Sequence, residues 1–402
     1  MRDVLVIGGG PTGSQVAGRL AGLGYSVAVV EQKTGLAEPV CCTGIISQEC
    51  ASAFGIEESV IYRRVNCACI FSPSGKQICL QRPEPQACIV NRSAFNVALA
   101  RRAQSAGAEY VLGGQVRGIE VGHDRVKVEM TGPESPRFLE ARTVVVATGF
   151  ASKLGEKLGL GGYRDFVMGA QAEVATVGVE EVEVYLGQEV APGFFAWLVP
   201  TSPNRALAGL LSRRNPGLYL KRFLAFLLDK GKITSAVVQP RYGGIPLKPL
   251  ARTCGDRLLV VGTAAGQVKP TTGGGIYFGL LCADAAADTL HQALQSGNLF
   301  SRGLASYERR WKRKLGQDLR VGYWARQFYE RLSDSQIDRI FDIMQSNGIV
   351  EVLLQDENIS FDWHGRAVLQ VVGHRALSRV LKTMRISLPE KTKKTSSTGV
   401  DK

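Results

Sequence analysis

The sequence predicts an α/β protein, α+β overall, in which a Rossmann-type domain carries an inserted antiparallel sheet and is followed by a C-terminal helical region. Two observations predict this architecture. A short apolar run at 4–7 leads directly into a glycine-rich turn, and strand-like alternation fills the region 163–245. At 402 residues, the chain is long enough for two or three domains.

The first 31 residues have the pattern of a βαβ unit whose second strand ends in Glu31. In such a unit, the glycines permit a tight turn, close backbone approach to a pyrophosphate and close packing of helix on strand. The carboxylate accepts hydrogen bonds from a ribose and disfavours a 2′-phosphate, so FAD or NAD is expected. The elements are a strand at 4–7, the turn Gly8-x-Gly10-x-x-Gly13, a helix at 14–23 and a strand at 25–30.

A second strand, glycine turn and helix recur far along the chain, between 258 and 287. Two such elements so far apart suit a long cofactor that is held at both ends. Between them the apolar pattern predicts a helix at 91–107 and strands at 110–116, 126–130 and 142–149.

The middle region alternates as in a mostly antiparallel sheet, and three of its aromatic residues need an explanation. Phe194, Phe195 and Trp197 stand between Pro192 and Pro200. Such side chains are either ordinary core residues or the wall of an apolar binding slot.

Three motifs, taken with the front βαβ unit, resemble flavoproteins of the para-hydroxybenzoate hydroxylase type, and among these the geranylgeranyl reductase family most closely. The similarity spans most of residues 1–370. The motifs are Pro39-Val-Cys-Cys42-Thr-Gly44, Pro192-Gly-Phe-Phe195-Ala-Trp197-Leu-Val-Pro200 and Gly262-Thr-Ala-Ala-Gly266 through Gly273-Gly-Gly-Ile276.

The resemblance implies an FAD site whose contacts can be carried over by position. Cys42, Phe195 and Trp197 are expected to line the catalytic pocket. Two positions depart from the family pattern: Thr263 stands where an Asp is usual, and Phe195 where a Tyr is usual. The cofactor contacts implied are Gly8, Gly10, Thr12, Gly13, Glu31, Cys42, Thr43, Ile45, Arg92, Val116, Thr263, Gly275 and Ile276.

The same reasoning divides the chain into four parts. The cofactor-binding domain is expected to be discontinuous, and the substrate domain is inserted into it. The expected parts are 1–60 with 85–160 and 240–300 for FAD, 61–84 with 161–239 for substrate, 301–385 for the helical region, and 386–402 for a disordered tail.

Nine cysteines are present, seven of them between 41 and 88. The N-terminus has no signal-peptide pattern, so a reducing, cytoplasmic compartment is expected and a disulfide framework is not. Cys67, Cys69, Cys79 and Cys88 suggest a metal site, but a Cys-x-x-Cys pair is missing. We therefore expect no metal.

The net charge of +13 points to an anionic partner. Residues 309–314 hold five basic side chains in six, on a helix that continues with aromatic residues through 332. Such a helix is either a solvated face or a peripheral contact with anionic lipid through 309–330. No nucleic-acid-binding module is recognisable, and no stretch has the length and apolar character of a membrane span.

These observations predict an FAD-dependent reductase that saturates carbon–carbon double bonds of geranylgeranyl or polyprenyl chains. The substrate class is a lipid or a prenyl diphosphate, and the electron donor is NAD(P)H or ferredoxin. Two alternatives remain open at this point: a flavin-dependent monooxygenase or oxidase acting on an aromatic substrate, and a flavin-less binding homologue.

Overall fold

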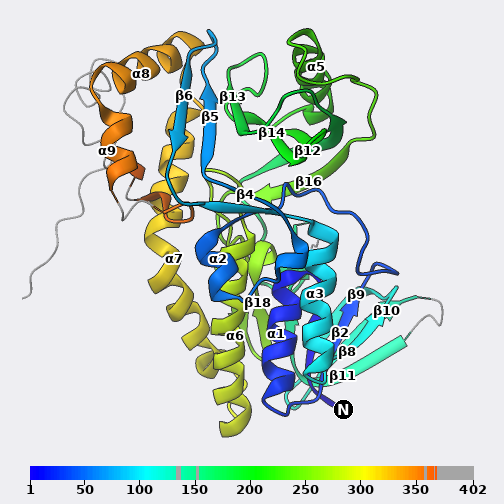
Figure 1. Cartoon of the computed structure of the whole chain (residues 1–402). Coiled ribbons are helices and arrows are strands. Elements are labelled where there is room, and N and C mark those ends of the chain that lie inside the picture. The colour runs from blue at the N-terminus through cyan, green and yellow to red at the C-terminus, as the bar shows by residue number, and fades with distance from the viewer. Residues whose placement is uncertain (133–136, 151–153, 357–359, 366, 369–402) are drawn as a thin grey trace, which may run out of the picture.

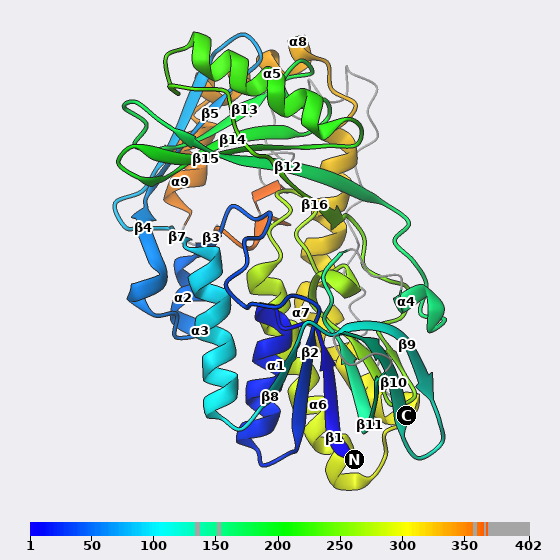
Figure 2. The same cartoon turned by 90° about the vertical axis from the view of Figure 1, so that its right-hand side faces the viewer.

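In the computed structural model, the described residues are 1–132, 137–150, 154–356, 360–365 and 367–368. Two layers are evident: a mainly parallel sheet with its helices, and a second sheet above it (Figures 1 and 2). The helices are α1 (Pro11–Gly22), α2 (Gln48–Ala53), α3 (Arg92–Ser105), α4 (Leu154–Lys157), α5 (Pro216–Asp229), α6 (Ile276–Ser296), α7 (Ser301–Tyr329), α8 (Asp334–Ser346) and α9 (Ile349–Gln355).

The larger sheet confirms the predicted Rossmann-type core. Its central strands are parallel and are buried over 4–7, 27–30 and 143–146, as the continuous β-branched run at the front predicts. Helices α1, α3 and α6 cover one face. In spatial order the strands are β17 (Cys254–Gly255), β18 (Leu258–Val260), β11 (Arg137–Val146), β1 (Arg2–Ile7), β2 (Val27–Glu31) and β8 (Glu109–Leu112), with β10 (Val126–Thr131) and β9 (Gln115–Val121) added beside β11.

The second sheet is mostly antiparallel, as expected from the alternation in the middle of the chain. One face packs on α5, and the other faces the parallel sheet (Figure 2). In spatial order the strands are β16 (Arg241–Pro246), β12 (Phe166–Ala175), β15 (Arg205–Ser212), β14 (Phe195–Ser202), β13 (Val182–Leu186), β5 (Cys67–Phe71) and β6 (Gln77–Gln81). A small sheet of β3 (Ile45–Ser47), β7 (Ala87–Val90) and β4 (Ile61–Val65) lies between the layers.

Helix α7 runs along both layers, and α8 and α9 pack beside the β5–β6 hairpin (Figure 1). Helix α7 begins at Ser301, well before the basic cluster at 309–314. Its aromatic residues turn inward: Trp311 is buried and donates a 2.9 Å hydrogen bond to Thr253 Oγ1. Tyr323 donates to Asp165 Oδ2 at 2.7 Å. Within the described part of the chain, no helix combines the length and hydropathy that a membrane crossing requires.

Two expectations about local structure are wrong. The strand expected at 110–116 is interrupted at Gly113, whose φ of +72° turns the chain between β8 and β9. A disulfide joins Cys69 and Cys79, although the cysteines were expected to be unpaired. These two residues lie directly opposite each other on β5 and β6, with Cα atoms 4.1 Å apart, and this register brings the sulfurs together.

The four-part division of the chain stays a prediction. Strand β16 begins next to the expected boundary at 240 and pairs with β12 in the second sheet. The expected tail at 386–402, and the end of the helical region before it, lie outside the described residues.

Candidate functional site

A cavity of about 490 Å³ opens at the carboxyl ends of β1, β2 and β11. Strand β1 pairs with β2 on one side and with β11 on the other, so the chain crosses over in opposite directions here. Ligands of open α/β sheets bind at such a switch point. The expected cofactor residues that line the cavity are Gly8, Gly10, Thr12, Glu31, Arg92, Val116 and Thr263.

The glycine turn shapes the floor of the cavity. Gly8 has φ +107°, and a Cβ there would lie 2.4 Å from the carbonyl oxygen of Ala147. At Gly13 a Cβ would lie 1.9 Å from the oxygen of Gly8, so α1 could not pack this close to β1. A Cβ at Gly10 meets nothing within 4 Å, which leaves the backbone open to the cavity. Gly10 caps α1 without a side-chain hydrogen bond, so the helix N-terminus can receive an anion.

Glu31 faces the turn from the end of β2. Its carboxylate accepts hydrogen bonds from the backbone N–H of Gly9 at 2.7 Å and of Lys33 at 2.9 Å. One donor reaches each oxygen, so each keeps a lone pair for a further donor. The carboxylate is thus fixed at the cavity wall and can accept hydroxyl hydrogen bonds.

Several side chains that line the cavity carry buried polar atoms without a hydrogen-bond partner. They are Arg92 (Nε and Nη1), Asn96 (Oδ1) and Thr148 (Oγ1). Buried polar groups are nearly always paired in proteins, so a cluster of unpaired ones around a cavity indicates a polar ligand. The Arg92 guanidinium requires that this ligand offers an acceptor, and an anion suits it best.

The second glycine segment meets the first at Thr12. A Cβ on Gly262 or Gly279 would lie 2.7 or 2.6 Å from Thr12 Oγ1, so only glycine admits this side chain. Thr263, next in the chain, lines the cavity. Its Oγ1 would lie 3.4 Å from a Cβ on Gly275, the residue that caps α6 ahead of Ile276.

The remaining expected residues lie where the two sheets meet, outside the residues that line the cavity. Thr43 Oγ1 donates a 3.1 Å hydrogen bond to Gln171 of β12. Cys42 precedes it, partly buried, and burial raises the pKa of the neighbouring Cys41 thiol to about 11. Ile45 packs with Trp197 in one apolar cluster. The segment 41–45 therefore connects the parallel sheet to the second one.

Phe195 and Trp197 share the face of β14 that looks toward the parallel sheet. Their ring centroids are 5.9 Å apart. A Cβ on Gly209 would lie 2.5 Å from the Trp197 indole, so this glycine makes room for the ring. Trp197 Nε1 is buried without a partner. Phe194 is completely buried in the apolar cluster that both rings pack against, and it lies under Arg326, whose guanidinium carbon is 3.6 Å from the ring centroid.

A segment near the C-terminus holds the second glycine segment in place. Lys269 forms a buried ion pair with Asp362 at 2.6 Å, with side chains 7% and 3% exposed. His364 pairs through Nδ1 with Thr271 Oγ1 at 2.6 Å and through Nε2 with the oxygen of Phe361 at 2.7 Å. Burial lowers the pKa of His364 to about 4, so the ring is neutral at physiological pH.

Comparison with known proteins shows the family to which the chain belongs. Residues 3–346 match a family model described as lycopene cyclase protein. Digeranylgeranylglycerophospholipid reductase 2 of Methanothermobacter thermautotrophicus is 32% identical over 87% of this chain and 93% of its own. The corresponding reductase of Methanocaldococcus jannaschii is 31% identical over 85% and 90%. The chain belongs to the geranylgeranyl reductase family. It is therefore an oxidoreductase, and the resemblance drawn from its motifs is confirmed.

Solved structures agree as well. A geranylgeranyl bacteriochlorophyll reductase-like protein of Thermoplasma acidophilum superimposes with a TM-score of 0.83 at 26% identity, covering 96% of this chain and 98% of that one. The halogenase PltM in complex with FAD shares the fold, with a TM-score of 0.68 at 15% identity over 92% and 86%. This second likeness concerns the fold alone.

Sequence reasoning missed several residues of the site. Asn96 lies one helical turn after Arg92, so its i+4 spacing was a usable signal. Thr148 is the last residue but one of the strand-like run at 142–149. For Asp362, His364 and Arg326, no pattern in the sequence signals a contact with the glycine segment or with Phe194.

Proposed function

We propose that the chain is an FAD-dependent reductase that saturates carbon–carbon double bonds of geranylgeranyl or other polyprenyl chains, carried by lipids or prenyl diphosphates. The observation that carries the proposal is the cavity at the switch point of the parallel sheet, lined by unpaired polar atoms of Arg92, Asn96 and Thr148. The named relatives are reductases of a geranylgeranyl lipid, which supports the substrate class.

The residues of the cavity offer suitable partners for the successive parts of FAD. The helix N-terminus at Gly10 and the guanidinium of Arg92 would hold the pyrophosphate, and Glu31 would accept from the adenosine ribose. Val116 would contact adenine, and Thr12 would complete the adenosine end. Thr263 with Gly275 and Ile276 would hold the ribityl chain and ring. Reduced FAD, when bound, supplies the hydride for an alkene carbon.

The other residues of the site would position the alkene and exclude water. Cys42, Thr43 and Ile45 would lie along the flavin, and Phe195 and Trp197 would form the wall of an apolar slot. Such a slot binds an isoprenoid chain through its surface area and discriminates weakly between chain lengths. Because a phenylalanine stands where the family has tyrosine, the proton for the second carbon comes from Cys42 or from a water.

Helix α7 would bring the protein to the surface of a membrane that holds the substrate. The side chains of Arg309, Lys312, Arg313 and Lys314 are exposed on it. Each such cation contributes about 1 kcal/mol to binding at an anionic surface. Trp311 and Tyr323 of this helix make hydrogen bonds inside the protein instead, so peripheral contact through its basic residues would be electrostatic and weakened by salt. Electrons would come from NAD(P)H or ferredoxin.

The test uses the full chain loaded with FAD and reduced without oxygen. Adding a geranylgeranyl glycerophospholipid should reoxidise the flavin, and mass spectrometry should show two hydrogens gained for each bond. A saturated-chain analogue is the matched control and should leave the flavin reduced. Incorporation of oxygen into a phenol would instead establish a monooxygenase, and a chain that never retains FAD would establish the flavin-less alternative.

A further inference from the structure

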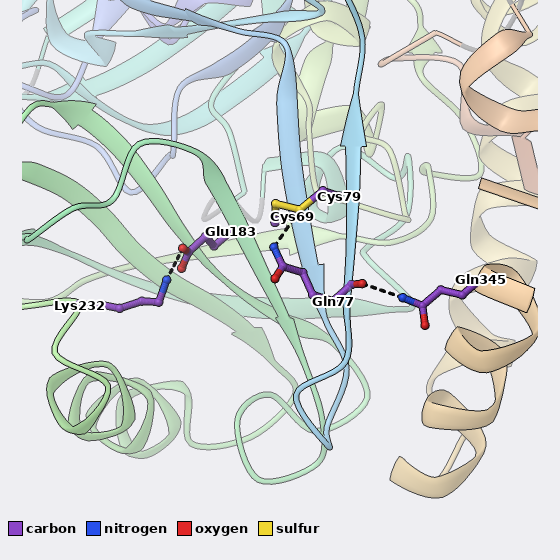
Figure 3. Close-up of a disulfide and its surroundings, with 6 residues drawn as sticks. All are labelled: Cys69, Gln77, Cys79, Glu183, Lys232 and Gln345. Atoms are coloured by element: carbon purple, nitrogen blue, oxygen red, sulfur yellow. Dashed lines mark hydrogen bonds and ion pairs between the residues drawn. A yellow bond between two sulfur atoms is a disulfide. The ribbon is translucent and has the colours of Figure 1, made fainter. Parts of the chain in front are cut away.

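Three cysteines gather on one face of the β5–β6 hairpin, away from the cavity. Cys67 and Cys69 are two residues apart on β5, so they point to the same side, and Cys79 lies opposite Cys69 on β6. Their Sγ atoms all lie within 4.8 Å of one another. Cys69 and Cys79 form a disulfide (Figure 3), and Cys67 is a free thiol beside it.

Opening the disulfide would place three thiols on a common surface. A dithiol reductant of the thioredoxin class gives two electrons and two protons to the Cys69–Cys79 bond and leaves as its own disulfide. A tetrahedral zinc site with Zn–S bonds of about 2.3 Å holds its sulfurs about 3.8 Å apart. Sulfurs already confined within 4.8 Å reach that spacing by side-chain rotation, without a change of strand register.

We propose that Cys67, Cys69 and Cys79, when reduced, bind one thiophilic d¹⁰ cation of the Zn²⁺ class, and that the disulfide is the oxidised state of the same site. Binding replaces three S–H bonds by three metal–sulfur bonds, releases three protons and moves no electrons. The fourth position is open to water. The missing Cys-x-x-Cys pair is no obstacle, because the i, i+2 spacing of a strand aligns two thiols just as well.

The surroundings of the cluster favour a cation. Glu183 lies beside Cys69 on the neighbouring strand β13, and Glu181 immediately precedes that strand. The Glu183 carboxylate is paired with Lys232 (Figure 3), whereas Glu181 contributes negative charge next to Cys67.

The hairpin is held in place from its other face, so the site does not depend on its own sulfur chemistry to form. Ile78 of β6 is buried against Ile337 and Phe341 of α8. Gln345 of α8 donates a 2.9 Å hydrogen bond to the backbone oxygen of Gln77. The Gln77 side chain in turn donates to Cys79 Sγ at 2.8 Å, an interaction that stabilises a thiolate.

The cluster is also reachable from solution. Cys79 is exposed on β6, the edge strand of the sheet, and Cys67 is partly exposed on the adjacent strand β5. The cysteines Cys50, Cys88 and Cys282 are buried, by contrast. A soluble reductant and a hydrated cation can therefore reach this cluster.

The experiment is a metal titration of the full chain, reduced with a phosphine under anaerobic conditions. Co²⁺ serves as the probe, with elemental analysis of the desalted protein as a second readout that a bound flavin cannot disturb. We expect one Co²⁺ per chain with thiolate-to-cobalt absorption, lost when Zn²⁺ is added. Affinity should fall at least tenfold in Cys67→Ser and Cys79→Ser, whereas Cys254→Ser, far from the cluster, should bind as the wild type does.

Three results would overturn the proposal: no metal retained by the reduced wild type, equal retention by the Cys67→Ser and Cys79→Ser variants, or equal retention with the disulfide intact. Circular dichroism of each variant checks that it is folded. The readout does not involve FAD or a prenyl lipid, so its failure is distinguishable from failure of the proposed reductase activity.

Discussion

Replacing Arg92 with methionine is expected to weaken FAD binding and, at the same time, to stabilise the protein without FAD. Arg92 begins α3 and lines the cavity, and its Nε and Nη1 atoms are buried without a partner. A buried donor left unpaired costs about 1–3 kcal/mol. Methionine keeps much of the side-chain length and has no hydrogen-bond donor, so the folded variant does not carry this free-energy cost.

The change in stability and the change in FAD affinity can both be estimated from the contacts of Arg92. The variant gains stability because no buried donor is left unpaired, but it loses the contact with the Phe95 ring, whose centroid is 5.1 Å from the Arg92 guanidinium carbon. Such cation–π contacts are worth about 0.5–1 kcal/mol. The protein without FAD should therefore gain about 1 kcal/mol. With FAD, losing a hydrogen bond from a charged group costs about 1.5–3 kcal/mol, which is about a 10- to 150-fold weaker Kd.

Urea unfolding of the flavin-free proteins measures the first effect, and flavin-fluorescence titration measures the second. Arg92→Lys is the matched control, because it keeps the charge and loses the forked geometry, so its Kd should fall between the other two. The reasoning is refuted if Arg92→Met binds FAD within about twofold of the wild type, or if its flavin-free form loses stability.

Three further predictions concern the second glycine segment. Thr263→Asp should tighten FAD binding in the same titration, because a carboxylate accepts a charge-assisted bond from a ribityl hydroxyl; weaker binding would contradict this. Lys269→Met and Asp362→Ala should each cost about 3–5 kcal/mol of unfolding free energy, and the double variant less than their sum, because each single change leaves a buried charge unpaired. Since the folded-state pKa of His364 is lowered to about 4, stability should fall as pH drops from about 6.5 toward 4, by up to about 3 kcal/mol. Urea unfolding of His364→Gln across that range should show a flatter profile, and an unchanged profile would exclude His364 as the cause.

The parts of the fold that the sequence predicted are those specified over short distances. The front βαβ unit combines a β-branched run, spaced glycines and a terminal acid within 31 residues, and the structure has it as β1, α1 and β2. The break between β8 and β9 was missed although Gly113 and Gly114 form a local turn signal, whereas the requirement for glycine at 114 comes from a distant strand. A Cβ on Gly114 would lie 2.3 Å from Met130 Cε, an atom of another strand.

The same limit holds for the site. Arg92 and Thr263 were placed by motif, and both line the cavity. The Lys269–Asp362 pair joins residues 93 positions apart, and no periodicity connects them. The disulfide was missed for another reason. The expectation of a reducing compartment was applied to all the cysteines together, whereas the pairing of Cys69 with Cys79 depends on the register of β5 and β6.

The contact of Thr12 with Gly262 and Gly279 has a consequence for biosynthesis. The glycine turn leaves the ribosome among the first residues, but the wall that closes over it lies some 250 residues later, beyond β18. During translation the early turn stays exposed, without the strand that flanks β11 and without α6. We therefore expect the proposed cofactor to be loaded late in maturation: a chain truncated before residue 258 would keep its glycine turn but lack Val261 and Thr263 of the cavity wall.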